Sequence, residues 1–68
     1  MEELMEMIRE LPTGCQVIFN LYAIEGYKHH EIAKMLNVSE GTSKSQFARA
    51  RQLLKEKMIN ANKSYGRG

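Results

Sequence analysis

The sequence contains no aspartate, a single cysteine, a single proline and no long apolar run. No serine stands in the spacing of a nucleophile elbow, and no glycine-rich phosphate loop is present. Cys15 alone cannot form an intramolecular disulfide, and no Cys/His spacing suits a zinc site. We therefore expect a protein that is not an enzyme and that holds neither a metal nor another cofactor.

The missing apolar run also bears on location. A membrane span needs ~20 apolar residues, and the N-terminus, Met-Glu-Glu-Leu, is acidic where a secretory signal is basic. The lone Cys15 is typical of a small buried hydrophobe in a reducing compartment. We expect a soluble, cytoplasmic protein without a membrane partner or a small-molecule substrate. Its 68 residues suffice for one domain.

The charged residues of the chain are distributed unevenly between its two halves. Its net charge is only +2, but residues 1–38 carry three Lys or Arg against six Glu, and residues 39–68 carry seven against two. A surplus of positive charge in the C-terminal half favours a polyanionic partner there.

Apolar spacing and helix-breaking residues predict an all-α, four-helix domain. We expect helices over about 2–10, 13–24, 29–36 and 39–58. The second has apolar residues around most of its circumference, so it should be the central and most buried helix. Gly26 suits a left-handed C-cap of the second helix, and Asn37 suits positive φ in the link to the fourth. Residues 60–68 have no periodicity, and we expect a disordered tail.

The last two helices, over about 29–50, have the arrangement of a helix-turn-helix, with Ser39 as the N-cap of the second. On a helical wheel of ~100° per residue the fourth helix has two distinct sides. The inward side is expected to contain Ser43, Phe47, Ala50 and Leu54. The outward side is expected to contain Lys44, Ser45, Ala48, Arg49, Gln52 and Lys55.

The outward side has the chemistry of a major-groove reader. Arg49 is the best candidate for a bidentate base contact and Lys44 the second, while Ser45 can bond to several base edges. Ala48 is small enough to let the helix sit deep, and its methyl group can touch a thymine methyl. The remaining candidates are expected near the DNA backbone: Thr42, Arg51, Lys55 and His29.

Several segments together resemble region 4 of sigma-70-type RNA polymerase sigma factors, and the extracytoplasmic-function (ECF) group in particular. They span roughly residues 10–58: Leu11-Pro12, Val17-Ile18-Phe19-Asn20-Leu21, Glu25-Gly26-Tyr27, Glu31-Ile32-Ala33-Lys34-Met35-Leu36, and Ser39-Glu40-Gly41-Thr42 through Arg49-Ala50-Arg51. We accordingly expect residues 1–59 to form a region-4-like domain.

This resemblance implies that the last long helix recognises the promoter −35 element in double-stranded DNA. It also implies docking on the β-subunit flap of RNA polymerase and, in many ECF sigma factors, an anti-sigma factor that covers the domain. The family's base-facing positions fall on Lys44, Ser45, Ala48 and Arg49, and a backbone-facing one on Thr42. Region 2, which melts the −10 element, does not fit into 68 residues. The chain therefore looks like an excised C-terminal domain or a region-4-only protein, unable to initiate transcription by itself.

Two positions depart from the family pattern. Ser43 stands where valine is usual on the buried side, so its hydroxyl needs a partner, for which a carbonyl one turn back is available. Gln46 stands where arginine is common, which removes one phosphate contact, and Phe47 can fill the space that Ser43 leaves.

Two other functions fit the same residues. A response-regulator output domain shares the Glu-Ile-Ala and Gly-Thr segments and would self-associate through its last helix. A pure interaction module would bind polymerase or an anti-sigma factor without reading DNA, and Met5, Met7 and Met35 could form its adaptable surface.

Overall fold

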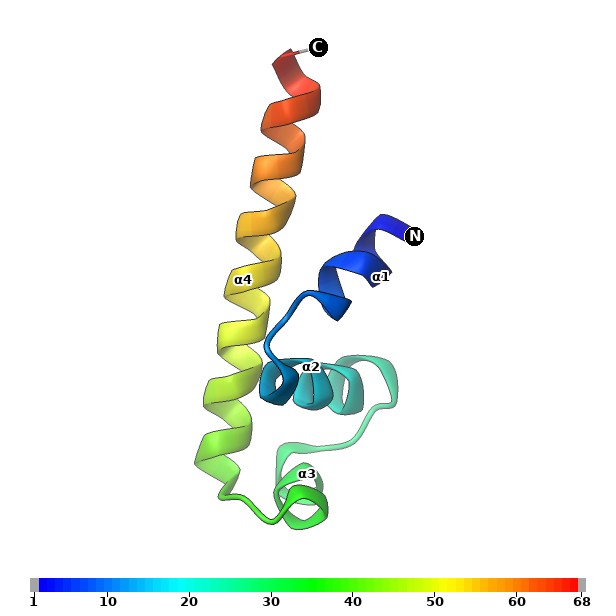
Figure 1. The fold of residues 1–68 in the computed structure, drawn as a ribbon. Helices are drawn as coiled ribbons and strands as arrows, with labels where there is room; N and C mark the ends of the chain where they lie inside the picture. Colours follow the sequence, from blue (N-terminus) through cyan, green and yellow to red (C-terminus); the bar gives the residue numbers. More distant parts are fainter. Residues whose placement is uncertain (1, 68) are drawn as a thin grey trace.

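A computed structural model gives the architecture of the chain. It describes residues 2–67, with side chains described for residues 4–60. Four α-helices and one π-helical segment follow in order: α1 (Glu2–Arg9), α2 (Thr13–Phe19), η1 (Asn20–Ile24), α3 (His29–Leu36) and α4 (Glu40–Arg67). Helices α1, α2 and α3 lie along one side of the long α4, and the molecule measures 46 × 19 × 16 Å (Figure 1). The predicted all-α fold with a helix-turn-helix is confirmed.

The links between helices have the backbone that their residues favour. Gly26 has φ +84°, and Asn37 has φ 58°, as predicted for both. Ser39 caps α4, because its Oγ accepts a hydrogen bond from the Thr42 amide at 3.0 Å. The turn between α3 and α4 is therefore short and fixed at both of its ends.

The second helix differs from its prediction. From Asn20 onward the backbone is π-helical, with the Glu25 amide bonded to the Asn20 carbonyl at 3.0 Å. The helix is also less buried than predicted, since Tyr22 is 39% and Ile24 57% exposed. The reason is that three short helices form a single layer against α4, so one side of α2 and η1 faces solvent.

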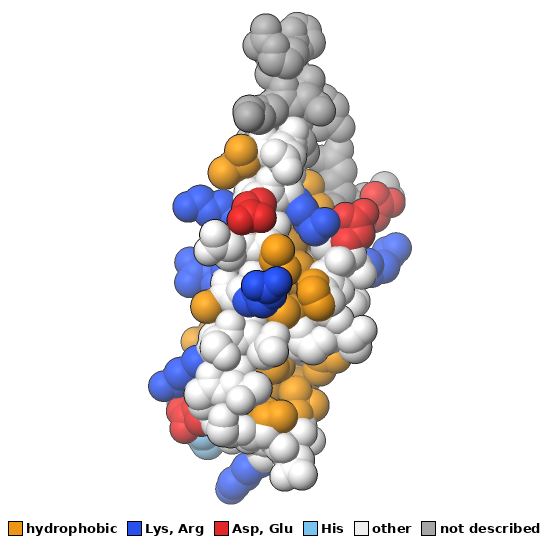
Figure 2. All heavy atoms as spheres, turned by 60° about the vertical axis from the view of Figure 1, so that its left-hand side comes forward, with side chains coloured by type: hydrophobic (Ala, Val, Ile, Leu, Met, Phe, Trp, Pro, Cys, Tyr) orange, Lys and Arg blue, Asp and Glu red, His pale blue; other side chains and the backbone are white. Residues whose placement is uncertain are grey.

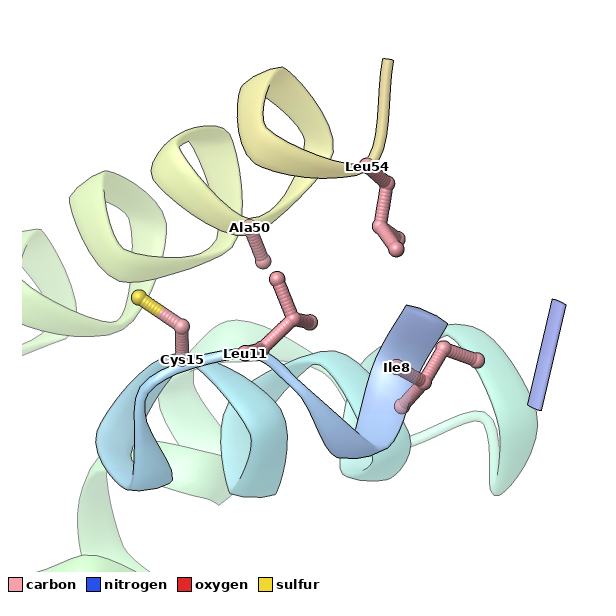
Figure 3. Packing of buried hydrophobic residues seen from close by; sticks show 5 residues of the cluster. All are labelled: Ile8, Leu11, Cys15, Ala50 and Leu54. Carbon is pink, nitrogen blue, oxygen red and sulfur yellow. The ribbon is translucent and has the colours of Figure 1, made fainter. Parts of the chain in front are cut away.

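An aliphatic cluster joins α1, α2 and the middle of α4. Its buried members are Ile8, Leu11, Cys15, Ala50 and Leu54 (Figure 3). Ala50 and Leu54 project from α4 towards Leu11 in the α1–α2 link, and the small Ala50 lets the helices approach closely. Cys15 is buried as predicted, and its thiol donates a hydrogen bond to Gln46 Oε1 at 2.9 Å.

Helix α4 is longer than predicted. The sequence predicted an end near residue 58 and a disordered tail over 60–68, whereas the helix continues to Arg67. No proline interrupts this stretch, and each residue added to an existing helix gains one backbone hydrogen bond. In the part of the chain that the structure describes, no helix is both long and apolar enough to span a membrane.

Candidate nucleic-acid interface

The buried side of α4 fixes how the helix lies on the domain. Ser43 and Ala50 are fully buried, Leu54 is nearly so, and Phe47 is half-buried. The predicted inward side is therefore confirmed. Because side chains on a helix repeat at about 3.6 residues per turn, the opposite side must face away from α1, α2 and α3.

That opposite side presents a cluster of polar, basic and small side chains. Seven of the predicted DNA-contacting residues are exposed on α4: Lys44, Ser45, Ala48, Arg49, Arg51, Gln52 and Lys55. Figure 2 shows basic side chains distributed along the face formed by α4, with apolar ones between them. We call this set the outward face. The structure brings these residues together on one helix, directly after the tight turn.

Several members of the outward face have polar neighbours on the same helix. The Lys44 ammonium lies 3.8 Å from a Glu40 carboxylate oxygen, and both side chains are more than half exposed. Ser45 Oγ donates to the Thr42 carbonyl at 3.2 Å. An exposed ion pair such as that between Lys44 and Glu40 contributes little free energy to folding. Lys44 can therefore exchange Glu40 for a DNA phosphate or base with little loss of stability.

Thr42 lies at the start of α4, on the edge of the outward face. Its side chain is half-buried, its amide is bonded to Ser39 Oγ, and its Oγ1 accepts a hydrogen bond from the same hydroxyl at 2.9 Å. The cap thus engages one of the first-turn amides, and a phosphate contact by Thr42 stays a prediction.

His29 does not lie on the outward face. Its ring stacks on Tyr22, with centroids 4.2 Å apart and planes at 13°, and its Nδ1 lies 2.8 Å from Ser43 Oγ. The ring also meets Phe47 edge-on at 5.7 Å. The imidazole is therefore turned partly into the fold, and the predicted contact of His29 with the DNA backbone stays a prediction.

The same contact corrects the interpretation of Ser43. Its hydroxyl is bonded to a histidine of the neighbouring helix, where the sequence offered a carbonyl one turn back. Sequence reasoning missed this pair and the part of Tyr22 in it. The available signal was a hydroxyl on the buried stripe of α4, which required a polar partner from another element.

A second surface feature, also missed from the sequence, lies beside the outward face. An apolar groove with a volume of about 800 Å³ runs between α4 and the ends of α1 and α2. Its lining consists of Leu4, Phe19, Ala48, Arg51, Gln52, Leu54, Lys55, Met58 and Ile59. Met58 and Ile59 are about half exposed, at 50% and 49%. The groove and the outward face therefore overlap, and they share Ala48, Arg51, Gln52 and Lys55.

The methionines singled out from the sequence do not form this groove. Met5 and Met35 are 50% and 51% exposed on α1 and α3, and Met7 packs against the aliphatic cluster. Among the described residues, no three potential metal ligands lie close enough together to hold an ion.

Comparison with known proteins assigns the sequence to a family. A family model described as "Sigma-70, region 4" matches residues 1–54, from the N-terminus through the paired helices to Leu54. Neither curated proteins nor solved structures gave a significant match. The matched segment includes the helix-turn-helix and most of the outward face. The chain therefore belongs to the sigma-70 region 4 family.

Proposed function

We propose that this protein is the −35-reading module of an ECF-type sigma factor, acting in the cytoplasm as part of transcription initiation. The observation that carries the proposal is the separation of sides on α4: Ser43 and Ala50 are fully buried, while Lys44 and Arg49 are exposed. A helix with one anchored side and one free basic side can enter the major groove without unfolding its domain. The family match favours this function over the response-regulator alternative.

The roles proposed for the outward face follow its chemistry. Arg49 and Lys44 reach guanine acceptors, Ser45 bonds to a base edge, and Ala48 leaves room for close approach. Thr42, Arg51 and Lys55 contact phosphates, which position the domain without reading sequence. Gln52 extends the reading surface by one turn. With few phosphates neutralised, about 4–6, the isolated domain binds weakly and with strong salt dependence.

Binding to selected DNA tests this proposal. A duplex is first selected by the wild-type protein from a library randomised over about one helical turn, and its affinity is compared with that of a scrambled duplex by fluorescence anisotropy. We expect Arg49→Ala to weaken binding to the selected duplex by about 5- to 150-fold and to reduce discrimination between the two duplexes.

The matched control is Arg9→Ala, which removes an equally charged, exposed side chain from α1. It should leave both affinities nearly unchanged. If Arg49→Ala weakens both duplexes equally, Arg49 does not read sequence. If no duplex binds even at low salt, the protein is an interaction module and the DNA-reading function is wrong.

The groove supports a second part of the proposal, a protein-docking function. Apolar side chains of Leu4, Met58 and Ile59 stand beside the basic Arg51 and Lys55. Such a surface fits an amphipathic helix with acidic residues at its margin. Following the resemblance, we assign it to the β-subunit flap of RNA polymerase, with an anti-sigma factor as a competing occupant.

Two methionines of equal exposure allow a matched test of docking. Met58→Asp places a charge in the groove, whereas Met35→Asp places one on α3, away from it; the wild-type side chains are 50% and 51% exposed. We expect Met58→Asp to weaken binding of an isolated β-flap domain at least tenfold by calorimetry, because the carboxylate must lose its water against apolar side chains. Met35→Asp should bind as the wild type does. Equal loss in both variants would contradict the assignment of the groove.

A further inference from the structure

Helix α3 is attached to the domain differently from the other helices. The aliphatic cluster takes its buried residues from α1, the α1–α2 link, α2 and α4, and α3 contributes none. The one buried apolar residue of α3 is Ile32, which is fully enclosed. Helix α3 nevertheless packs closely against α4, and the side-chain hydrogen bond between His29 and Ser43 adds a directional contact between the two helices.

This bond connects the beginnings of the two helices of the helix-turn-helix. His29 is the first residue of α3, and Ser43 lies in the first turn of α4, immediately before Lys44 and Ser45. The distance between Nδ1 and Oγ is 2.8 Å, and Ser43 is fully buried. A buried hydroxyl that loses its partner is unfavourable, so the helix orientation that keeps this bond is preferred over neighbouring ones.

The ring that supplies the bond is itself held in place. Tyr22 of η1 stacks on one face of the imidazole, and Phe47 of α4 stands edge-on to it. Tyr22 and Phe47 also contact each other, with ring centroids 4.6 Å apart. Nδ1 is thus aimed at Ser43 by contacts from two other elements, and a movement of α3 by about an ångström would break a bond whose range is roughly 2.7–3.2 Å.

We propose that His29 is a positioning residue: through Ser43 it sets the orientation of α4 from which Lys44, Ser45 and Arg49 read bases, and it does not itself touch DNA. This inference rests on the proposed function. Base contacts depend on direction and phosphate contacts much less so. A domain without the bond should therefore lose discrimination between sequences before it loses general affinity for DNA.

Two single variants and their combination test the proposal. His29→Phe keeps a ring to stack on Tyr22 but removes Nδ1, and Ser43→Ala removes the hydroxyl. His30→Phe is the matched control, because His30 is the adjacent histidine and is exposed. Affinities for the selected and scrambled duplexes are measured at a temperature at which circular dichroism shows every variant to be folded.

We expect each single variant to bind the selected duplex about tenfold more weakly, within the range of one lost base contact, and the scrambled duplex less than about twofold more weakly. The double variant should be no worse than either single one, because all three lack the same bond. His30→Phe should behave as the wild type.

Other outcomes overturn the inference in distinguishable ways. Equal weakening of both duplexes in His29→Phe would mean that His29 contacts the DNA backbone, and the proposed function would survive. A lower melting temperature with unchanged discrimination in Ser43→Ala would mean that the pair serves stability alone. Absence of discrimination in the wild type would overturn the proposed function itself.

Discussion

Lys28 is a residue that suits its position poorly. It precedes α3 with the extended backbone of an N-cap, φ −85° and ψ 159°. Its ammonium group has no acceptor for the first amides of the helix. Glu31 Oε1 accepts a hydrogen bond from the Lys28 amide at 2.8 Å, which provides half of a capping box. The other half requires an oxygen on residue 28.

Replacing Lys28 by serine should therefore stabilise the domain. A serine hydroxyl can accept a bond from the amide of residue 30 or 31, so we expect Lys28→Ser to raise the free energy of unfolding by about 0.5–2 kcal/mol. Urea denaturation measures the change. Lys28→Ala is the control, which removes the same charge without supplying an acceptor and should give no such gain. Equal gains in both variants would point to the charge instead of the cap.

His29 shows what residue-level patterns can and cannot predict. The wheel correctly assigned Ser43 to the buried side of α4, because that conclusion needs only helical periodicity. It could not assign a partner to Ser43, because His29 lies on another helix, 14 residues away in sequence. Charge and position alone predicted that His29 contacts the DNA backbone, and they gave no sign of its bond to Ser43. The same limit applies to Cys15, whose burial was predicted but whose bond to Gln46 spans 31 residues.

At the scale of elements, α1 and Glu10, the residue that follows it, are joined to α4 by two kinds of contact. Ile8 is 5% exposed and belongs to the aliphatic cluster. The second contact is an ion pair between Lys57 Nζ of α4 and Glu10 Oε1, 2.9 Å apart. The Lys57 side chain is 32% exposed and the Glu10 side chain 64%. Burial of an aliphatic side chain should outweigh an exposed ion pair by a wide margin.

Separate removal of the two contacts measures which one holds α1. We expect Ile8→Ala to lower the free energy of unfolding by about 2–5 kcal/mol. Glu10→Gln, which keeps the shape of the side chain, should lower it by less than about 1 kcal/mol, and by less still at high salt. Urea denaturation at two salt concentrations gives both values. A larger loss in Glu10→Gln would reverse this assignment.

The bounds of the elements follow the sequence where local chemistry decides them. Residues 29–36 were predicted as a helix and are one, since Gly26 and Asn37 bracket it with positive φ. The segment 13–24 is helical, but apolar spacing does not distinguish α-helical from π-helical backbone, so the change at Asn20 was not predicted. The length of α4 was underestimated because its predicted end was taken from apolar periodicity, whereas the backbone stays helical to Arg67.

At the scale of the whole molecule, the acidic and basic residues are separated between different helices. The chain's acidic half forms α1, α2 and α3, and its basic half forms α4. A duplex approaching α4 is therefore attracted to one side of the domain. Arg51 and Lys55 belong to both the outward face and the groove, so under the proposed function DNA and an acidic docking helix would draw on the same two cations.

Placement of charge, and not net charge, should accordingly govern DNA binding. For about 4–6 neutralised phosphates, the logarithm of the binding constant should fall against the logarithm of salt concentration with a slope of about −4 to −5. Arg51→Gln should make the slope shallower by about 1 and weaken selected and scrambled duplexes alike, because a phosphate contact carries no sequence information. Arg9→Gln changes the net charge equally from α1, so its slope should match the wild type. Anisotropy titrations over a range of salt concentrations measure all three slopes, and identical slopes for the two variants would show that the domain binds DNA through its overall charge without a defined face.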